Sequence, residues 1–171
     1  SLYYPMDSTT GVNVLSTLDG LGMMTGDFAV FGDVNYSAPF TDMLPNKDVA
    51  NRIFFPLNVD SSDDKLIGLA TDYLSKYDDC ETQTDINVKY YLGYDIANVI
   101  VDAIRKCVEQ GLEINGVNVN TCLEQVDYQG ITGRIPFSPT SHQSTHDSCT
   151  LYMYEIVNGE YVCHGAFEYD K

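Results

Sequence analysis

The chain has 171 residues, 44% of them hydrophobic and 20% charged, with 9 basic against 25 acidic residues and a formal net charge of −16. This composition, with 12% aromatic residues, is typical of a globular protein with one sizeable core and not of an acidic disordered chain. The small number of Lys and Arg residues excludes nucleic acid and anionic membrane as expected partners, because basic side chains supply most of the attraction to phosphate groups.

Strands and helices alternate in the first part of the chain. The apolar residues 2–6 predict a short strand, and the polar residues 7–10 supply N-cap candidates for a helix. The apolar positions of that helix are Val14, Leu15, Leu18 and Leu21. A continuous apolar run between two Gly-Asp pairs predicts a buried strand at 28–31.

A third apolar run, 53–57, predicts another strand, and a short helical piece is expected around 39–44 before it. Pro56 has no backbone N–H, so this strand is expected to lie at the edge of a sheet or to end near Pro56. Residues 61–64 match a capping pattern that precedes an amphipathic helix. The apolar positions of this helix are Leu66, Ala70, Tyr73, Leu74 and Tyr77.

A longer helix is predicted from near Tyr90 to just before Gly111. Its apolar face is predicted to consist of Leu92, Ile96, Val99, Ile100, Ala103, Ile104 and Cys107. The acidic segment 77–85 shows no apolar periodicity, which predicts a solvated loop or a hinge.

Strands are favoured in the last third of the chain. A short helix is expected at 121–126 and a strand at 130–137, and Asn158-Gly159 is a strong hairpin signal between the runs 151–156 and 161–167. This order of elements places the chain in the α/β class, with a three-layer, mainly parallel sheet and a C-terminal antiparallel hairpin.

Five cysteines are present without a C-x-x-C pair, which excludes a zinc ribbon and a thioredoxin-type motif. Cys107 and Cys122 each lie in a predicted helix with a Gly-containing loop between them, so a disulfide between them is geometrically possible. Two buried reduced thiols are the favoured interpretation, and both alternatives stay open.

Several patterns that suggest ligand binding or catalysis have simpler structural explanations. The glycines within 20–26 end a helix, whereas a dinucleotide fingerprint begins one. His142 and His146 have the spacing of two metal ligands, but their surroundings favour a solvated loop. The aspartates at 60, 63, 64, 78 and 79 lack the spacing of a hand-type calcium loop. No nucleophile elbow, Walker loop or metalloprotease motif is present, so neither an enzyme nor a metal or cofactor is expected.

The most informative polar residues follow the first two predicted strands. Ligands of open parallel sheets bind beyond the carboxyl ends of the strands, where Asp7, Ser8 and Asp33 are expected. An Asp there would pair with the ammonium group of a zwitterionic solute, and the N–H groups of the helix beginning near Ser8 would receive an anionic group. Turn and cap chemistry alone would also select Asp and Ser, so both interpretations remain open.

Several stretches of the chain carry a family resemblance. Residues 93–104 begin Gly-Tyr-Asp within the long helix, residues 128–137 have the sequence Tyr-Gln-Gly-Ile-Thr-Gly-Arg-Ile-Pro-Phe, and residues 151–162 form the closing hairpin. With the strand and loop at 28–33, these stretches resemble the type I periplasmic solute-binding proteins, especially the branched-chain amino-acid-binding subfamily of bacterial ABC importers. The resemblance extends over essentially the whole chain.

Members of that family have two lobes and are longer, and this chain matches only their second half. The resemblance therefore implies that residues 1–84 form part of a second lobe, residues 85–127 the hinge and crossing helices, and residues 128–171 returning strands of the same lobe. It also implies that the first lobe is missing, which would leave sheet edges and a helix face uncovered. A separate piece of protein, or self-association by exchange of elements, is expected to cover them.

The function that the resemblance implies is that of an extracytoplasmic component that presents amino acids or similar small polar solutes to a membrane ABC permease, without catalysis or a cofactor. Two closing lobes would hold the solute, with contributions from Asp7, Ser8 and Asp33 and, from the hinge side, from Tyr90 or Tyr91. The implied location is the periplasm or, as a lipoprotein, the surface of a bacterium. Two alternatives stay open: a ligand-sensing domain of a receptor or regulator with the same fold, and a small α/β enzyme.

Overall fold

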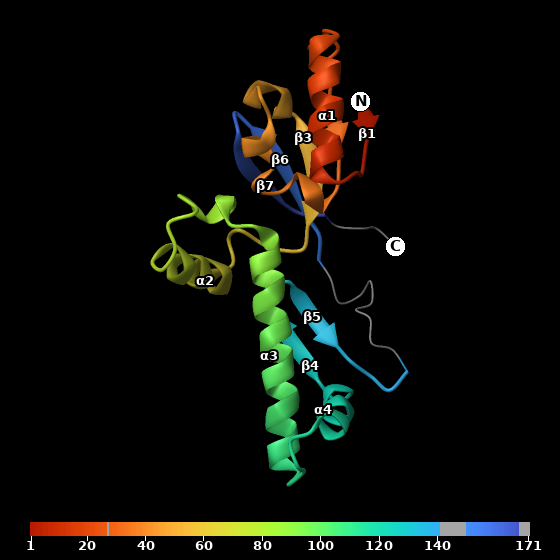
Figure 1. Cartoon of the computed structure of the whole chain (residues 1–171), viewed down its shortest axis with the longest axis vertical. Helices are drawn as coiled ribbons and strands as arrows, with labels where there is room; N and C mark the ends of the chain where they lie inside the picture. The colour runs from red at the N-terminus through yellow and green to blue at the C-terminus, as the bar shows by residue number, and fades with distance from the viewer. Residues whose placement is uncertain (27, 141–149, 168–171) are drawn as a thin grey trace. The chain divides into compact units, whose positions relative to one another are not determined.

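The computed structural model describes residues 1–26, 28–140 and 150–167, and the chain divides into two compact units (Figure 1). Unit 1 consists of Ser1–Val88 and Leu151–Lys171, and unit 2 consists of Lys89–Thr150. His142 and His146, with the spacing of two metal ligands, lie outside the described residues. The assignment of 1–84, 85–127 and 128–171 to a lobe, a hinge and returning strands stays a prediction.

Unit 1 is built around a five-stranded mixed sheet with the strand order β1-β2-β3-β6-β7. Its strands are β1 (Leu2–Tyr3), β2 (Val30–Phe31), β3 (Ile53–Leu57), β6 (Tyr152–Val157) and β7 (Glu160–Ala166). Strands β1, β2 and β3 are parallel, whereas β6 and β7 join the sheet antiparallel. Asn158 and Gly159, with φ angles of 53° and 85°, form the tight turn of the predicted C-terminal hairpin.

In the described part of unit 1, two α-helices and four short 3₁₀ segments accompany the sheet. They are α1 (Ser8–Gly20), η1 (Val34–Tyr36), η2 (Phe40–Met43), η3 (Lys47–Ala50), α2 (Asp64–Leu74) and η4 (Gln83–Asp85). Asp63 is the N-cap of α2, because its side chain accepts a hydrogen bond from the backbone N–H of Lys65 at 2.7 Å. Leu15 is buried in α1, whereas Leu21, predicted on the same apolar face, is exposed because the helix ends there.

The two faces of the sheet in unit 1 differ in burial. Side chains alternate along a strand, and on one face they are buried: Val30, Ile53, Phe55, Leu57, Tyr154 and Ile156. On the opposite face Tyr3 is 73% exposed and Phe31 is 42% exposed, and Val162 is also exposed. One face of the sheet in unit 1 is therefore buried, whereas the other carries exposed apolar side chains.

Pro56 lies in a central strand, so the prediction that its strand is at the sheet edge is wrong. The Phe54 carbonyl accepts a hydrogen bond from the Gly32 N–H at 2.8 Å on the β2 side of β3. The backbone nitrogen of Pro56, two residues further along β3, points toward the same side, at a level of the sheet beyond the end of β2. The sheet therefore loses no hydrogen bond through the missing N–H of Pro56. The strand ends at Leu57, which confirms the second prediction, that it ends near Pro56.

Unit 2 consists of a long helix with a short helix and a hairpin beside it (Figure 1). Its elements are α3 (Val88–Glu109), α4 (Gly116–Leu123), β4 (Asp127–Gly130) and β5 (Gly133–Pro136). The helix α4 begins earlier than the predicted 121, because the side chain of Asn115 caps it by accepting from the Asn118 N–H at 3.0 Å. Where one strand is predicted at 130–137, the structure has the antiparallel pair β4–β5.

The buried face of α3 agrees with the predicted one at Val99, Ala103 and Cys107 and differs from it at other positions. Its fully or nearly fully buried residues are Val88, Tyr91, Asp95, Val99, Ala103 and Cys107. Ile96 and Ile100, predicted on the same face, are 59% and 47% exposed. The helix carries apolar residues on two sides, so apolar periodicity alone does not select the side that packs.

Within the described ranges, no helix is both long and apolar enough to cross a membrane.

Candidate functional site

The carboxyl ends of β1 and β2 lie side by side, because the two strands are parallel neighbours. Just beyond them, the Tyr4 N–H donates to the Phe31 carbonyl at 2.8 Å. Asp7 and Ser8 follow the first strand, and Asp33 follows the second. The structure thus places these three predicted site residues at one edge of the sheet in unit 1.

Asp7 is exposed and forms the N-cap of α1. Its two carboxylate oxygens accept hydrogen bonds from the Thr10 N–H at 3.0 Å and from the Thr10 hydroxyl at 2.6 Å. These hydrogen bonds lower the pKa of Asp7. Ser8, half-buried, is the first residue of the helix. Both oxygens of Asp7 are therefore engaged in capping, as the turn-and-cap interpretation predicts.

Asp33 is half-buried and precedes η1. Its Oδ1 accepts a hydrogen bond from the Asn35 N–H at 2.9 Å. Among the residues that the structure describes, its Oδ2 accepts no hydrogen bond. Both carboxylate oxygens of Asp7 thus accept hydrogen bonds from its own helix turn, whereas only one oxygen of Asp33 is engaged in this way.

Tyr36 fills the space beside these residues, and sequence analysis missed it. Its side chain is fully buried, and its hydroxyl donates to the Tyr4 carbonyl at 2.8 Å. At Gly32 a Cβ would lie only 2.9 Å from Tyr36 Cγ, and at Gly11 it would lie 3.1 Å from the Tyr36 hydroxyl oxygen. Burial, and then the negative charge of Asp33, raise the pKa of Tyr36 to about 12. The glycines on α1 and after β2 therefore make room for one buried, neutral tyrosine.

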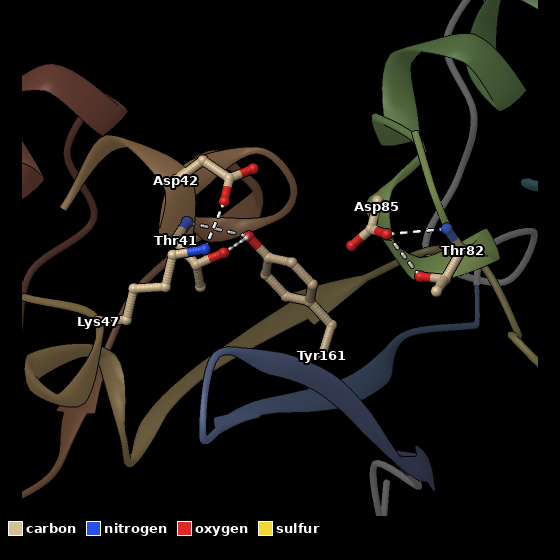
Figure 2. Close-up of polar contacts among 6 residues, drawn as sticks. All are labelled: Thr41, Asp42, Lys47, Thr82, Asp85 and Tyr161. Atoms are coloured by element: carbon tan, nitrogen blue, oxygen red, sulfur yellow. Dashed lines mark hydrogen bonds and ion pairs between the residues drawn. The ribbon is translucent and has the colours of Figure 1, made fainter. Parts of the chain in front are cut away.

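A second set of polar contacts, within unit 1, connects the C-terminal hairpin to the segment η2. Figure 2 shows the hydroxyl of Tyr161, on β7, beside Thr41 of η2. The Tyr161 oxygen accepts from the Thr41 N–H at 3.1 Å and lies 3.3 Å from the Thr41 hydroxyl oxygen. Burial raises the pKa of Tyr161, and the neighbouring Lys47–Asp42 ion pair, at 2.7 Å, is exposed. This group has a structural role, because its tyrosine stays protonated and its charges face solvent.

The chemistry available at the strand ends is charge pairing and hydrogen bonding. In the part of the chain that the structure describes, no group of three or more His, Cys, Asp or Glu residues could hold a metal ion. Burial raises the pKa of Cys80 and, with the hydrogen bond to Cys122, raises that of Cys107 to about 11. The pKa of a catalytic cysteine is lowered, whereas the pKa values of Cys80 and Cys107 are raised. These two cysteines therefore give no support to the enzyme alternative.

Tyr90 and Tyr91 belong to unit 2, near the start of α3. Their ring centroids are 5.7 Å apart with an interplanar angle of 66°, and Tyr91 is buried while Tyr90 is half-buried. Their contact with a solute, and that of Asp7, Ser8 and Asp33, stays a prediction.

No protein-family model and no curated protein sequence matches the chain. The structure is similar to the crystal structure of the branched-chain amino acid transporter substrate binding protein LivJ from Streptococcus pneumoniae in complex with isoleucine, with a TM-score of 0.71 and 18% sequence identity. The match covers 96% of this chain and 42% of that chain. The chain therefore has the α/β fold of a type I periplasmic-binding-protein lobe and spans less than half the length of that structure.

Proposed function

We propose that this chain is part of an extracytoplasmic solute-binding protein that delivers amino acids or similar small polar solutes to a membrane ABC permease. The observation that carries the proposal is the match of 96% of the chain to a substrate-binding protein, LivJ, whose structure contains isoleucine. The protein performs no chemistry on the solute. Its work is to enclose the solute between two lobes and release it.

The strand ends of unit 1 supply one wall of the solute site in this proposal. Asp33 pairs with the solute ammonium group through the carboxylate oxygen that its own loop leaves available. The N-terminus of α1, at Ser8, faces the anionic end of a zwitterion. The opposite wall comes from a lobe outside this chain, as the 42% coverage of the LivJ chain supports.

We expect the chain alone to bind isoleucine weakly or not at all, because one wall of the cleft is missing. In the protein that includes the opposite lobe, Asp33→Asn is expected to weaken binding by about 2 to 5 kcal/mol, because the solute ammonium is left desolvated without a partner. Calorimetric titration with isoleucine and the other standard amino acids measures both.

Asp7→Asn is the matched control for this titration. Asn caps a helix about as well as Asp and keeps an oxygen for the Thr10 N–H, so this change is expected to cost less than about 1 kcal/mol of stability and to leave the affinity nearly unchanged. If Asp33→Asn binds as tightly as the parent, the ammonium site lies elsewhere. If the two-lobed parent binds no amino acid, the proposed solute class is wrong.

The uncovered apolar surfaces support the proposal that another lobe, or a second copy, packs on this chain. Unit 1 exposes Tyr3, Phe31 and Val162 on one sheet face. Unit 2 exposes Ile96 and Ile100 on α3. Monomeric proteins rarely leave contiguous apolar faces uncovered.

The isolated chain is therefore expected to self-associate at low micromolar concentration despite its net charge of −16. Light scattering measures the mass, and Ile96→Asp with Ile100→Asp is expected to shift the population toward monomer. Asp102→Asn, on the same helix, is the control and should leave the mass unchanged. A monomeric parent chain with a cooperative melt would show that these 171 residues complete their own core.

A further inference from the structure

Cys107 and Cys122 face each other in the core of unit 2. Cys107 lies near the end of α3 and Cys122 near the end of α4, and both side chains are fully buried. The two are free thiols, and the Cys107 Sγ–H donates to the Cys122 Sγ at 2.8 Å. Apolar side chains form the rest of this cluster: Val99, Ala103 and Val126.

We infer that Cys107 and Cys122 are joined by a disulfide bond when the protein folds in an oxidising compartment. The inference rests on the extracytoplasmic location in the proposed function, because disulfides persist outside the reducing cytosol. A disulfide here would cross-link the C-terminal ends of α3 and α4. In a reducing compartment the same two residues would remain a buried apolar pair.

The chain between the two cysteines is folded back so that the two helix ends meet. Gly111, with a φ of 69°, turns the chain after α3, and the Leu112 N–H donates to the Cys107 carbonyl at 2.9 Å. Three residues beyond each cysteine, the Gln110 side-chain amide donates to Gln125 Oε1 at 2.9 Å. This second contact holds the same two helix ends together independently of the sulfur atoms.

The other described cysteines have different surroundings. Cys80 and Cys163 lie in unit 1 and are half-buried. The Cys80 Sγ–H donates to the Asp85 carbonyl at 3.5 Å. These surroundings make Cys80 a suitable control residue, because its replacement leaves unit 2 intact.

The bond forms by thiol–disulfide exchange with a small-molecule or protein disulfide as oxidant. One cysteine thiolate attacks an oxidant sulfur, which gives a mixed disulfide and releases one thiol. The second cysteine thiolate attacks the mixed disulfide and releases the other thiol, so two electrons and two protons pass to the oxidant. In the folded protein the pKa of Cys107 is raised to about 11, so the exchange is fastest while the chain folds, before α4 packs on α3.

Refolding of the full chain in a buffer of oxidised and reduced glutathione, followed by alkylation in denaturant and trypsin digestion, tests the bond. Trypsin cleaves after Lys106 and Arg134, and no Lys or Arg lies between them, so one peptide carries both cysteines. We expect this peptide to be unalkylated and lighter by two hydrogen atoms, and to take two alkyl groups after reduction. Alkylation of both residues without reduction would overturn the inference.

Thermal unfolding provides a second measurement. Reduction of the refolded chain is expected to lower Tm by roughly 5 to 10 °C, because the cross-link no longer restricts the unfolded chain. A Cys107→Ala, Cys122→Ala double variant should melt at a Tm that reductant does not change, whereas Cys80→Ser should keep the full shift. A parent Tm insensitive to reductant would overturn the inference. Neither measurement involves a solute or a cellular location, so their failure is distinct from a failure of the proposed solute binding.

Discussion

Asp95→Ala is expected to lower the free energy of unfolding of unit 2 by about 3 to 5 kcal/mol. Asp95 is fully buried, and its carboxylate accepts hydrogen bonds from the Ile131 N–H at 3.1 Å and from the Thr132 N–H and hydroxyl, both at 2.7 Å. The variant removes the acceptor of all three hydrogen bonds at a fully buried position. Urea unfolding followed by circular dichroism measures the loss.

Two further variants separate the hydrogen bonds from the volume of the side chain. Asp95→Asn keeps the shape of the side chain but replaces one carboxylate oxygen by an NH₂ group, which faces an N–H or O–H donor. This variant is therefore expected to be more stable than Asp95→Ala but less stable than the parent. Asp102→Ala, on the same helix, removes a partly exposed ion pair with Arg105 at 3.1 Å and is expected to cost about 0 to 1 kcal/mol. Equal losses for Asp95→Ala and Asp102→Ala would show that these hydrogen bonds do not hold the β4–β5 turn against α3.

Gly32→Ala is expected to destabilise unit 1 by about 3 kcal/mol through overpacking. The new Cβ would overlap the ring of Tyr36, where Cε2 lies 2.5 Å and Cγ 2.9 Å away. The ring cannot retreat easily, because it is fully buried and its centroid lies 4.7 Å from that of Phe40. Thermal and urea unfolding measure the effect.

A double-mutant cycle locates the cause in this one contact. In a Tyr36→Leu background, Gly32→Ala should cost much less than in the parent, because the overlapping ring is gone. Gly68→Ala is the control: a Cβ there meets nothing within 4 Å, and the change should stabilise α2 by about 1 kcal/mol. Additive losses for the two changes in the cycle would mean that Gly32 is required for another reason.

Features that depend on neighbouring residues in the chain could be predicted from the sequence. The Asp7 and Asp63 caps act on N–H groups within three residues, and the Asn158-Gly159 turn needs only its own backbone angles. The parallel order of β1 and β2 followed from apolar runs separated by a helix, and it placed Asp7 and Asp33 at one edge. The missed Asn115 cap is the exception, since its local signal was present in the sequence.

Features that depend on distant partners could not be predicted. The Tyr36 hydroxyl bonds a carbonyl 32 positions away, and Asp95 bonds Thr132 across 37 positions. A polar residue within an apolar helix is predicted to face solvent unless its buried partners are known. For that reason the apolar pattern of α3 suggested Ile96 and Ile100 for the packed face, whereas Asp95 and Tyr91 occupy it.

The interruption of unit 1 by unit 2 determines the order in which a growing chain completes its structure. Unit 2 is one continuous stretch, so all its contacts are available before the last strands have been synthesised. The sheet of unit 1 cannot be completed until the C-terminal strands have been synthesised. The Asn158 N–H donates to Asn51 Oδ1 across a sequence separation of 107, and the edge of β3 that pairs with β6 has no partner until β6 has been made. During this interval the nascent chain exposes an unpaired strand edge and aromatic residues. It is therefore expected to bind chaperones and to be prone to aggregation.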